Sequence, residues 1–522
     1  MLRKTSTFFL TIAMLALISA GSAWPTGTVV NGYDYGDTGG QKLPITDKPL
    51  TLTYFVQEHD STPFNKDWTI WKNLSEATGI TFDFIVAGAS SFEQKMRLLY
   101  STNDLPDIVE TRFALASEFG SQGGIANVND SLSIMPNYSK LLSTNQKMKS
   151  MVTTLDGKSY YLPGIYFDTW NLTWLYRSDI FKQQGITPPQ DTVGLVAALK
   201  KLKSAYPDVY PMINRQGIKG PFGLFSDIAP QWKTGYNMYW DQKLDTYKFG
   251  PIEDNYKRML MFLNSLYSQE LLDPEWATLA TKQWEDKLIN GRGFVTVDWV
   301  DRIESMLPAS RQVNPAWTLS ALMPIVEKGF GEPKIEVQNA ASEYDGFLVP
   351  ANSKHKNEAF KVLDFMYSPA GAQLTAFGKI GDTAVKGADG RISYTKNVQT
   401  PANPAGKNAY DAYYGFQTLG SYTWQYPDLE RALFTSPEIF AAWDMYKKAN
   451  VAFVSPTLKY TEIQRSQIAE IQADINDFCD SQTASFVVHG NFKDWDAYVA
   501  KVKSLKVDKL VELYNQVYKQ SK

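Results

Sequence analysis

The stretch that decides the fold is "LTLTYFVQEHDSTPFNKDWTIWKNLSEATGITFDFIVAG", residues 50–88. It opens with a run of β-branched, aromatic and aliphatic residues, which is typical of a buried strand. Apolar residues then recur at helical spacing over 67–78, with Asp67 placed to cap the helix and Gly79 placed to stop it. A second apolar run closes the stretch. The pattern therefore predicts a strand, a helix and a second strand.

The same alternation continues along the chain. "SFEQKMRLLYST" (91–102) has the spacing of a second helix, and "DIVE" (107–110) follows it as a third strand. Strands joined by helical crossovers form a parallel sheet wound in right-handed units. Further strands are expected at 173–178 and 344–350. A chain of 522 residues is too long for one compact core, so we expect more than one domain.

The N-terminus has the pattern of an export signal. Arg3 and Lys4 precede an apolar run of about 13 residues, which is shorter than the roughly 20 that span a membrane. Small residues before Trp24 predict cleavage after Ala23. Residues 1–23 are thus expected to be a signal peptide and residues 24–47, which are rich in Gly, Pro and Thr, a flexible leader. The mature chain is expected to be soluble and periplasmic or secreted.

Several classes of function are disfavoured by composition and motifs. The net charge of −3 provides no basic surface for nucleic acid. Three histidines lie far apart, and neither a phosphate-binding loop nor a GxSxG or GxGxxG motif is present. We therefore predict no cofactor, no catalytic residue and no transition-metal site. A calcium site made of carboxylates and carbonyls stays open, as does a glycosidase, because that chemistry requires only two carboxylates.

Aromatic residues make up 14% of the chain, and many stand beside polar residues at expected strand ends and loops. A sugar presents C–H faces that stack on aromatic rings and hydroxyls that bind charged side chains. The candidate ligand-binding residues selected on this basis are Glu58, His59, Arg112, Phe113, Trp170, Trp232, Trp240, Asp298, Trp299, Glu343, Tyr344 and Trp424.

Several candidates have an alternative structural interpretation. The tryptophans at 232, 240, 299 and 424 could instead pack in a core, and Glu58 and Asp298 could cap the helices that follow them. In "NGRGFVTVDWV" (290–300) we expect a turn, a buried strand and a ligand-facing tip at Asp298-Trp299. The residues alone leave these alternatives open.

Four stretches together resemble the family 1 extracellular solute-binding proteins of carbohydrate ABC importers, in particular their long, oligosaccharide-binding branch. They are "NDLPDIVETRF" (103–113), "LYRSDIFKQQGITPPQDT" (175–192), "YDGFLVPANSKHKNEAFKVLDFMYSPAGAQLTAFGKIGD" (344–382) and "ASFVVHGNFKDWDAYVAKVKSLKVDKLVELYNQVYKQ" (484–520). Many relatives carry a lipidated cysteine at the cleavage site. Here the only cysteine is Cys479, which implies a soluble periplasmic form and an organism with an outer membrane.

The resemblance implies a two-lobed α/β fold of the periplasmic binding protein type II. Each lobe would be a mostly parallel sheet flanked by helices, with hinge strands between the lobes and ligand held in the cleft. The first lobe would comprise 48–164 with 338–400, and the second 165–337 with 401–522. In relatives, the strand end matching Asp298-Trp299 supplies an aromatic ring to the sugar, the loop matching Glu58-His59 supplies polar contacts, and the segment matching Arg112-Phe113 borders the cleft.

The function implied is that of a receptor for an ABC importer, which binds an oligosaccharide and presents it to the permease subunits. We expect a monomer that is not an enzyme. Two alternatives are a secreted glycoside hydrolase acting on polysaccharides and a binding protein for a peptide or another charged solute. The former needs a pair of carboxylates across the cleft, and the latter an Arg or Asp clamp in place of aromatic rings.

Overall fold

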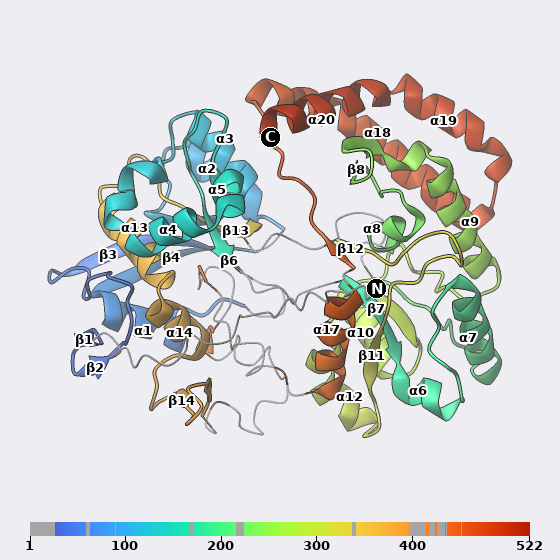
Figure 1. The fold of residues 1–522 in the computed structure, drawn as a ribbon, viewed down its shortest axis with the longest axis horizontal. Coiled ribbons are helices and arrows are strands. Elements are labelled where there is room, and N and C mark those ends of the chain that lie inside the picture. Colours follow the sequence, from blue (N-terminus) through green and yellow to red (C-terminus); the bar gives the residue numbers. More distant parts are fainter. Residues whose placement is uncertain are drawn as a thin grey trace, which may run out of the picture.

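The computed structural model contains two groups of elements, one on each side of Figure 1. It describes residues 27–58, 63–88, 90–165, 172–215, 224–336, 341–395, 398, 414–416, 423–424, 434, 436–449 and 451–522. One group surrounds a five-stranded sheet, the first lobe, and the other surrounds a three-stranded sheet, the second lobe.

The first lobe contains the predicted parallel strands. Its sheet has the order β4-β3-β5-β13-β6, formed by β3 (Leu50–Glu58), β4 (Ile80–Gly88), β5 (Ile108–Thr111), β6 (Leu162–Ile165) and β13 (Ala341–Leu348). β3 is parallel to β4 and β5, whereas β13 is antiparallel to both of its neighbours. The carboxyl ends of β3, β4, β5 and β6 therefore share one edge of the sheet, the edge at which β13 begins.

Helices cover this sheet, as expected from the alternating pattern. They are α1 (Thr69–Thr78), α2 (Phe92–Ser101), α3 (Phe113–Ser121), α4 (Pro136–Thr144), α5 (Gln146–Val152), α13 (Lys356–Met366) and α14 (Pro369–Phe377). α1 stops before Gly79 as predicted, and the φ of this C-cap residue is left-handed at 75°. Its N-cap position is occupied by Trp68 without a side-chain cap, so the prediction that Asp67 caps the helix is wrong.

The second lobe matches the expected parallel sheet only in part: Met212 forms parallel bridges with Val295 and Leu272, whereas the neighbouring strands of the three-stranded sheet are antiparallel. Its described sheet is β10-β7-β11, formed by β7 (Leu172–Arg177), β10 (Val295–Trp299) and β11 (Leu319–Leu322). β7 is antiparallel to both neighbours. The physical reason lies in the connections: β7 enters from the first lobe, as β13 enters from the second, so neither strand is joined to its neighbours by a helical crossover.

The helices of the second lobe form the right-hand side of Figure 1. They are α6 (Ser178–Gln183), α7 (Thr192–Ala205), α8 (Leu224–Ile228), α9 (Asp254–Ser268), α10 (Thr281–Ile289), α11 (Arg302–Ser305), α12 (Leu307–Val313), α17 (Pro437–Ala449), α18 (Glu462–His489), α19 (Trp495–Ser504) and α20 (Val507–Ser521). Two-stranded pairs are formed by β8 (Met238–Asp241) with β9 (Thr246–Phe249) and by β12 (Ile335–Glu336) with β16 (Ala452–Phe453). Cys479 is buried in α18, where desolvation raises the pKa of its thiol to about 11.

Consecutive described elements lie in different lobes at three points along the chain: from β6 to β7, from β12 to β13, and from β15 (Ile392–Tyr394) to α17. The register places Ile165 opposite Ala341 in the first sheet and Leu172 opposite Trp299 in the second. Each sheet therefore presents toward the other lobe the edge at which the chain crosses. The crossings run through residues outside the described part, so the expected domain limits stay predictions.

Residues 27–47 are not a flexible leader in this structure. They form the hairpin β1 (Val29–Val30) and β2 (Tyr33–Asp34) and then lie on the first lobe. Leu43 is 6% exposed, and the Ile45 amide donates to the Thr78 carbonyl at 2.8 Å. The Gly and Pro residues of this segment form tight turns on the surface of the first lobe. Apolar residues between the turns anchor the segment there.

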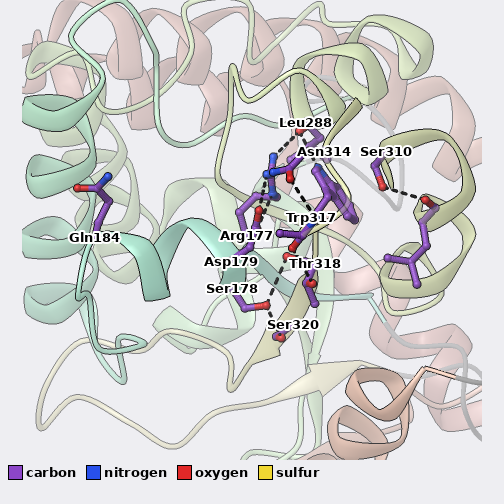
Figure 2. A network of polar contacts seen from close by, with 12 residues as sticks. Arg177, Ser178, Asp179, Gln184, Leu288, Ser310, Asn314, Trp317, Thr318 and Ser320 are labelled. Carbon is purple, nitrogen blue, oxygen red and sulfur yellow. Dashed lines mark hydrogen bonds and ion pairs between the residues drawn. The ribbon is translucent and has the colours of Figure 1, made fainter. Parts of the chain in front are cut away.

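The end of β7 that points away from the first lobe is fixed by a buried arginine (Figure 2). The Arg177 guanidinium forms a two-point ion pair with Asp179, at 2.7 and 2.8 Å, and donates to the Leu288 carbonyl at 2.9 Å. Its guanidinium carbon lies 5.0 Å from the centre of the Trp317 ring. These contacts tie the strand to the end of α10 and hold the second sheet rigid behind the edge that faces the first lobe.

Candidate ligand-binding site

Two edges of sheet face each other across the crossings, and most of the predicted residues that the structure describes lie on them. Glu58, Arg112, Glu343 and Tyr344 lie at the end of β3, just after β5 and near the start of β13. Trp299 ends β10 on the opposite side. Open α/β sheets bind ligands beyond the carboxyl ends of their strands, so these two edges form the candidate site.

Glu58 is the polar group at the end of β3. Its carboxylate accepts a hydrogen bond from the Phe64 amide at 2.9 Å. Phe64 precedes α1 by several residues, so this contact closes the loop and does not cap the helix, which answers the alternative left open for Glu58. The neighbouring candidate His59 lies outside the described residues.

Arg112 and Phe113 separate in the structure. Arg112 occupies the N-cap position of α3 with extended backbone, at the sheet edge, and its side chain is partly exposed. Phe113 points into the core, where its ring meets Tyr161 edge to face at 5.8 Å between centroids. Of this pair, only Arg112 keeps a partly exposed side chain at the sheet edge.

Glu110 is a buried carboxyl group that the sequence analysis did not select. It lies within β5 opposite Phe347, and it accepts a hydrogen bond from the Gln57 amide at 2.7 Å. Desolvation raises the pKa of Glu110 from 4.5 to about 8. An acid inside the apolar strand "DIVE", one position before the strand end, was the signal available in the sequence.

Asp298 is engaged entirely within the protein. Its Oδ2 pairs with Arg215 Nε, and its Oδ1 accepts from Arg215 Nη2 at 3.0 Å and from Arg302 Nε at 3.0 Å. The same Oδ1 accepts from the Trp299 amide at 2.9 Å. Arg302 extends the cluster to Glu285 at 3.2 Å. Asp298 is thus a buried anchor, and neither the hydroxyl-binding nor the helix-capping role that we had considered describes it.

The alternation of the strand explains why Asp298 is buried. Thr296 and Asp298 share the face of β10 that α10 covers, and Trp284 of α10 donates through Nε1 to Thr296 Oγ1 at 3.0 Å. Both Arg215 and Arg302 lie 5.4 Å from the Trp284 ring centre, a cation–π distance. This face is therefore polar but covered, and Trp299 belongs to the other face.

Trp299 and Trp424 lie at the two opposed edges. Trp299 is partly exposed at the last position of β10. Trp424 forms a bridge with Ile165 at the end of β6, where the Ile165 amide donates to the Thr423 carbonyl at 2.8 Å. Both side chains are half-buried, which leaves part of each ring system at the surface.

Glu343 and Tyr344 complete the first edge. The Glu343 carboxylate accepts from Thr457 Oγ1, which belongs to the segment between β16 and α18, and burial raises the pKa of Glu343. Tyr344 is 54% exposed. A phenol ring, an acid and a guanidinium thus stand together at one sheet edge.

Two candidates are not brought to these edges. Trp232 is 1% exposed in the core of the second lobe, 5.2 Å between ring centroids from Phe262, so it offers no face to a ligand. Trp240 lies on β8 and meets Tyr518 of α20 edge to face at 6.5 Å. Trp170 lies outside the described residues.

No three His, Cys, Asp or Glu side chains among the described residues come close enough to hold a metal ion. None of the helices in the described ranges has both the length and the apolar character needed to cross a membrane.

Comparisons with known proteins agree with this architecture. The family model described as bacterial extracellular solute-binding protein matches residues 45–373. The fructooligosaccharide ABC transporter substrate-binding protein FusA of Streptococcus pneumoniae serotype 4 is 22% identical, over 99% of this chain and 97% of that protein.

Solved structures show the same fold. Alginate-binding protein AlgQ2 without calcium superposes with a TM-score of 0.75 at 21% identity, over 91% of this chain and 99% of that one. An extracellular solute-binding protein from Bifidobacterium longum subsp. infantis gives a TM-score of 0.73 at 16% identity, with 91% and 99% covered. These likenesses confirm the two-lobed α/β fold.

Proposed function

Because this chain belongs to the bacterial extracellular solute-binding protein family, we propose that it is the receptor of an ABC importer and captures an oligosaccharide between its two lobes. The family match confirms the resemblance that the four sequence stretches indicated. The relatives reported above are named as binding proteins for fructooligosaccharide and alginate, which supports a carbohydrate ligand.

The observation that carries the proposal is the pairing of two sheet edges across the crossings. The first edge supplies Glu58, Arg112, Glu343 and Tyr344, and the second supplies Trp299. Hinge closure buries a ligand between two such faces, and its free energy derives from contacts made to both lobes at once. A ligand that touches only one edge would bind without closing the protein.

The chemistry of these groups suits a sugar. Each aromatic ring that stacks contributes about 0.5–1.5 kcal/mol beyond its area burial. Charge-assisted hydrogen bonds from Glu58 or Arg112 to hydroxyls add to this, and the sum is compatible with affinity at or below about 1 μM. Trp424 belongs to the proposed set through its place beside Ile165. His59 and Trp170 stay in the set on the sequence argument alone.

The remaining parts of the proposal concern partners and location. The receptor acts as a monomer, catalyses no reaction, and delivers its ligand to permease subunits, whose ATPase supplies the energy for import. It works in the periplasm or outside the cell after removal of the signal peptide near Ala23. Phe113, Trp232, Trp240 and Asp298 are excluded from the contact set, because their side chains are committed to packing or to ion pairs.

A thermal-shift screen tests the proposal. A ligand that binds only the folded state raises the free energy of unfolding by mass action, by about 2.7 kcal/mol at a hundredfold excess over Kd. The melting temperature rises with it. We expect at least one oligosaccharide from a panel of neutral and acidic glycans to raise Tm, and peptides of similar mass to leave it unchanged. Shifts with peptides and none with glycans would refute the carbohydrate ligand.

A further inference from the structure

The segment 454–461, which joins β16 to α18, lies between the two lobes, and we call it the strap. It is fastened to the second lobe at several points. Tyr247 Oη donates to the Pro456 carbonyl at 3.0 Å. The Lys459 amide donates to Ser521 Oγ at 2.8 Å, and the Lys459 carbonyl accepts from Gln520 at 2.8 Å. These contacts hold the strap backbone against β9 and α20.

Side chains of the strap alternate between the two lobes. Leu458 and Tyr460 pack against the core of the second lobe, and the Tyr460 ring meets Tyr514 edge to face at 6.2 Å. Thr457 instead donates to Glu343 of the first lobe. Since successive side chains of a non-helical, extended segment point to opposite sides, Lys459 leaves the strap on the same side as Thr457. From this alternation we expect its ammonium group to face the space between the lobes.

Lys459 has no carboxylate partner among the described residues. Its side chain is partly buried, and desolvation alone lowers the pKa of its ammonium group. The lysines of ion pairs in this structure, such as Lys248 and Lys287, have their pKa raised by their acidic partners. A desolvated cation without an anion is unfavourable until an anion arrives.

Arg112 is the corresponding cation on the first lobe. Within the described ranges its guanidinium has no ion pair and donates no hydrogen bond. It interacts electrostatically with Glu110, which Asp345 also approaches. Glu110 is mostly protonated at neutral pH because burial raises its pKa to about 8. Little of the Arg112 charge is therefore neutralised by Glu110.

We propose that Arg112 and Lys459, one from each lobe, select an anionic oligosaccharide, one that carries a carboxylate or sulfate group. The proposal rests on the proposed function and names the substrate class of that same site. Each cation would form a charge-assisted hydrogen bond with an acidic substituent on closure, which satisfies both partly buried charges at once. A neutral oligosaccharide would leave both cations without an anionic partner.

The test compares acidic glycans with neutral counterparts of the same chain length. Oligouronides, sulfated oligosaccharides and sialylated oligosaccharides are each paired with a carboxyl-reduced, desulfated or desialylated form, and Kd is measured by titration calorimetry at low and high salt. We expect one acidic member to bind at least about 10-fold more tightly than its partner, the typical effect of one charged hydrogen bond. The difference should shrink as salt rises.

Variants assign the effect to the two residues. Lys459→Gln should weaken binding of the acidic glycan by about 10-fold and change binding of the neutral form by less than about twofold. Arg112→Gln also removes the hydrogen bonds to hydroxyls, so it should weaken binding of both forms, and that of the acidic form by about 10-fold more. Lys447→Gln, at the exposed end of α17, is the matched control and should change neither. Circular dichroism and Tm verify that each variant is folded.

The outcomes separate this inference from the proposed function. Acidic and neutral forms that bind equally, or variants that keep the preference, would overturn the inference and leave the carbohydrate receptor intact. Glycans that fail to bind in either form would overturn both. A preference for the acidic form that disappears in the two variants, and not in the control, supports the inference.

Discussion

Asp298 and Arg215 form a two-point ion pair beneath the last residue of β10. The side chain of Asp298 is 3% exposed and that of Arg215 is 7% exposed. Asp298 also accepts a hydrogen bond from the Trp299 amide. The ion pair between Asp298 and Arg215 therefore positions the tryptophan that ends the strand. The acid beside the aromatic residue thus positions its neighbour at the candidate site.

Removing the charge of Asp298 should destabilise the second lobe. Asp298→Asn leaves the Arg215 guanidinium buried beside a neutral amide, and breaking a buried pair in this way costs about 3–5 kcal/mol. Urea unfolding followed by tryptophan fluorescence measures the loss. Glu285→Gln, which removes a more exposed partner of Arg302, is the control and should cost less than about 1 kcal/mol. Equal effects in the two variants would contradict the anchoring role.

Glu110 should make the protein less stable as pH rises. Its pKa in the folded state is about 8 against 4.5 for an exposed glutamate, so between these values the folded state holds a proton that the unfolded state has released. The free energy of unfolding therefore falls as pH rises through this window. The slope is about 1.4 kcal/mol per pH unit, because one proton is released on unfolding. Glu110→Gln should be more stable than the natural chain at pH 8.5 and equally stable at pH 4.

The check is urea unfolding of both proteins at several pH values. Glu512→Gln, at an exposed position on α20, serves as the control and should leave the pH profile unchanged. A Glu110→Gln variant whose stability keeps the same slope with pH as the natural chain would show that this carboxyl ionises normally in the folded state.

Residues 27–47 should contribute to stability. Leu43 is 6% exposed, and Leu43→Ala removes buried aliphatic carbon at a cost of about 2–4 kcal/mol. Val29→Ala alters a side chain in the same segment that is 61% exposed, so its effect should stay within about 0.5 kcal/mol. Thermal unfolding distinguishes the two. If both variants melt with the natural chain, the segment does not pack on the first lobe in solution.

Trp299 should contribute to ligand affinity. Trp299→Ala removes a stacking surface worth about 0.5–1.5 kcal/mol beyond area burial, so Kd for a glycan found in the thermal-shift screen should rise at least about 3- to 10-fold. Trp240→Ala, which removes a partly exposed tryptophan on β8, should leave Kd within about twofold. Calorimetric titration measures both. The reverse ranking would move the site away from the end of β10.

The alternating pattern of the first lobe could be predicted because each element there has a local signal. The spacing of apolar residues predicts β3, α1 and β4. The end of α1 is predicted by Gly79, whose left-handed φ stops the helix. The antiparallel direction of β7 could not be predicted in this way, since it depends on a strand entering from the other lobe. The packing of residues 27–47 was missed because their turns resemble those of a linker in the absence of the surface that they cover.

The sequence could predict where the candidate site lies in the fold, but it predicted only in part what each of its residues does. Strand ends pointed to Glu58, Arg112 and Trp299, which lie at the opposed edges. Asp298 has the same local pattern as a ligand-binding acid. Its commitment to Arg215, which is 83 residues away in the chain, is a tertiary contact that one sequence does not contain. The tryptophans divide in the same way, because burial of Trp232 depends on helices that meet only in the folded lobe.

The central claim is that a glycan closes the two lobes on one another. The distance between the lobes can be measured by pulsed electron paramagnetic resonance between two spin labels. The labels are attached at Leu155→Cys in the first lobe and Val193→Cys in the second, both exposed positions, in a Cys479→Ala background. A glycan that raises Tm should shift the distance distribution to a shorter and narrower form at saturation, and washing it out should restore the original. A bound glycan that leaves the distribution unchanged would contradict binding between the lobes.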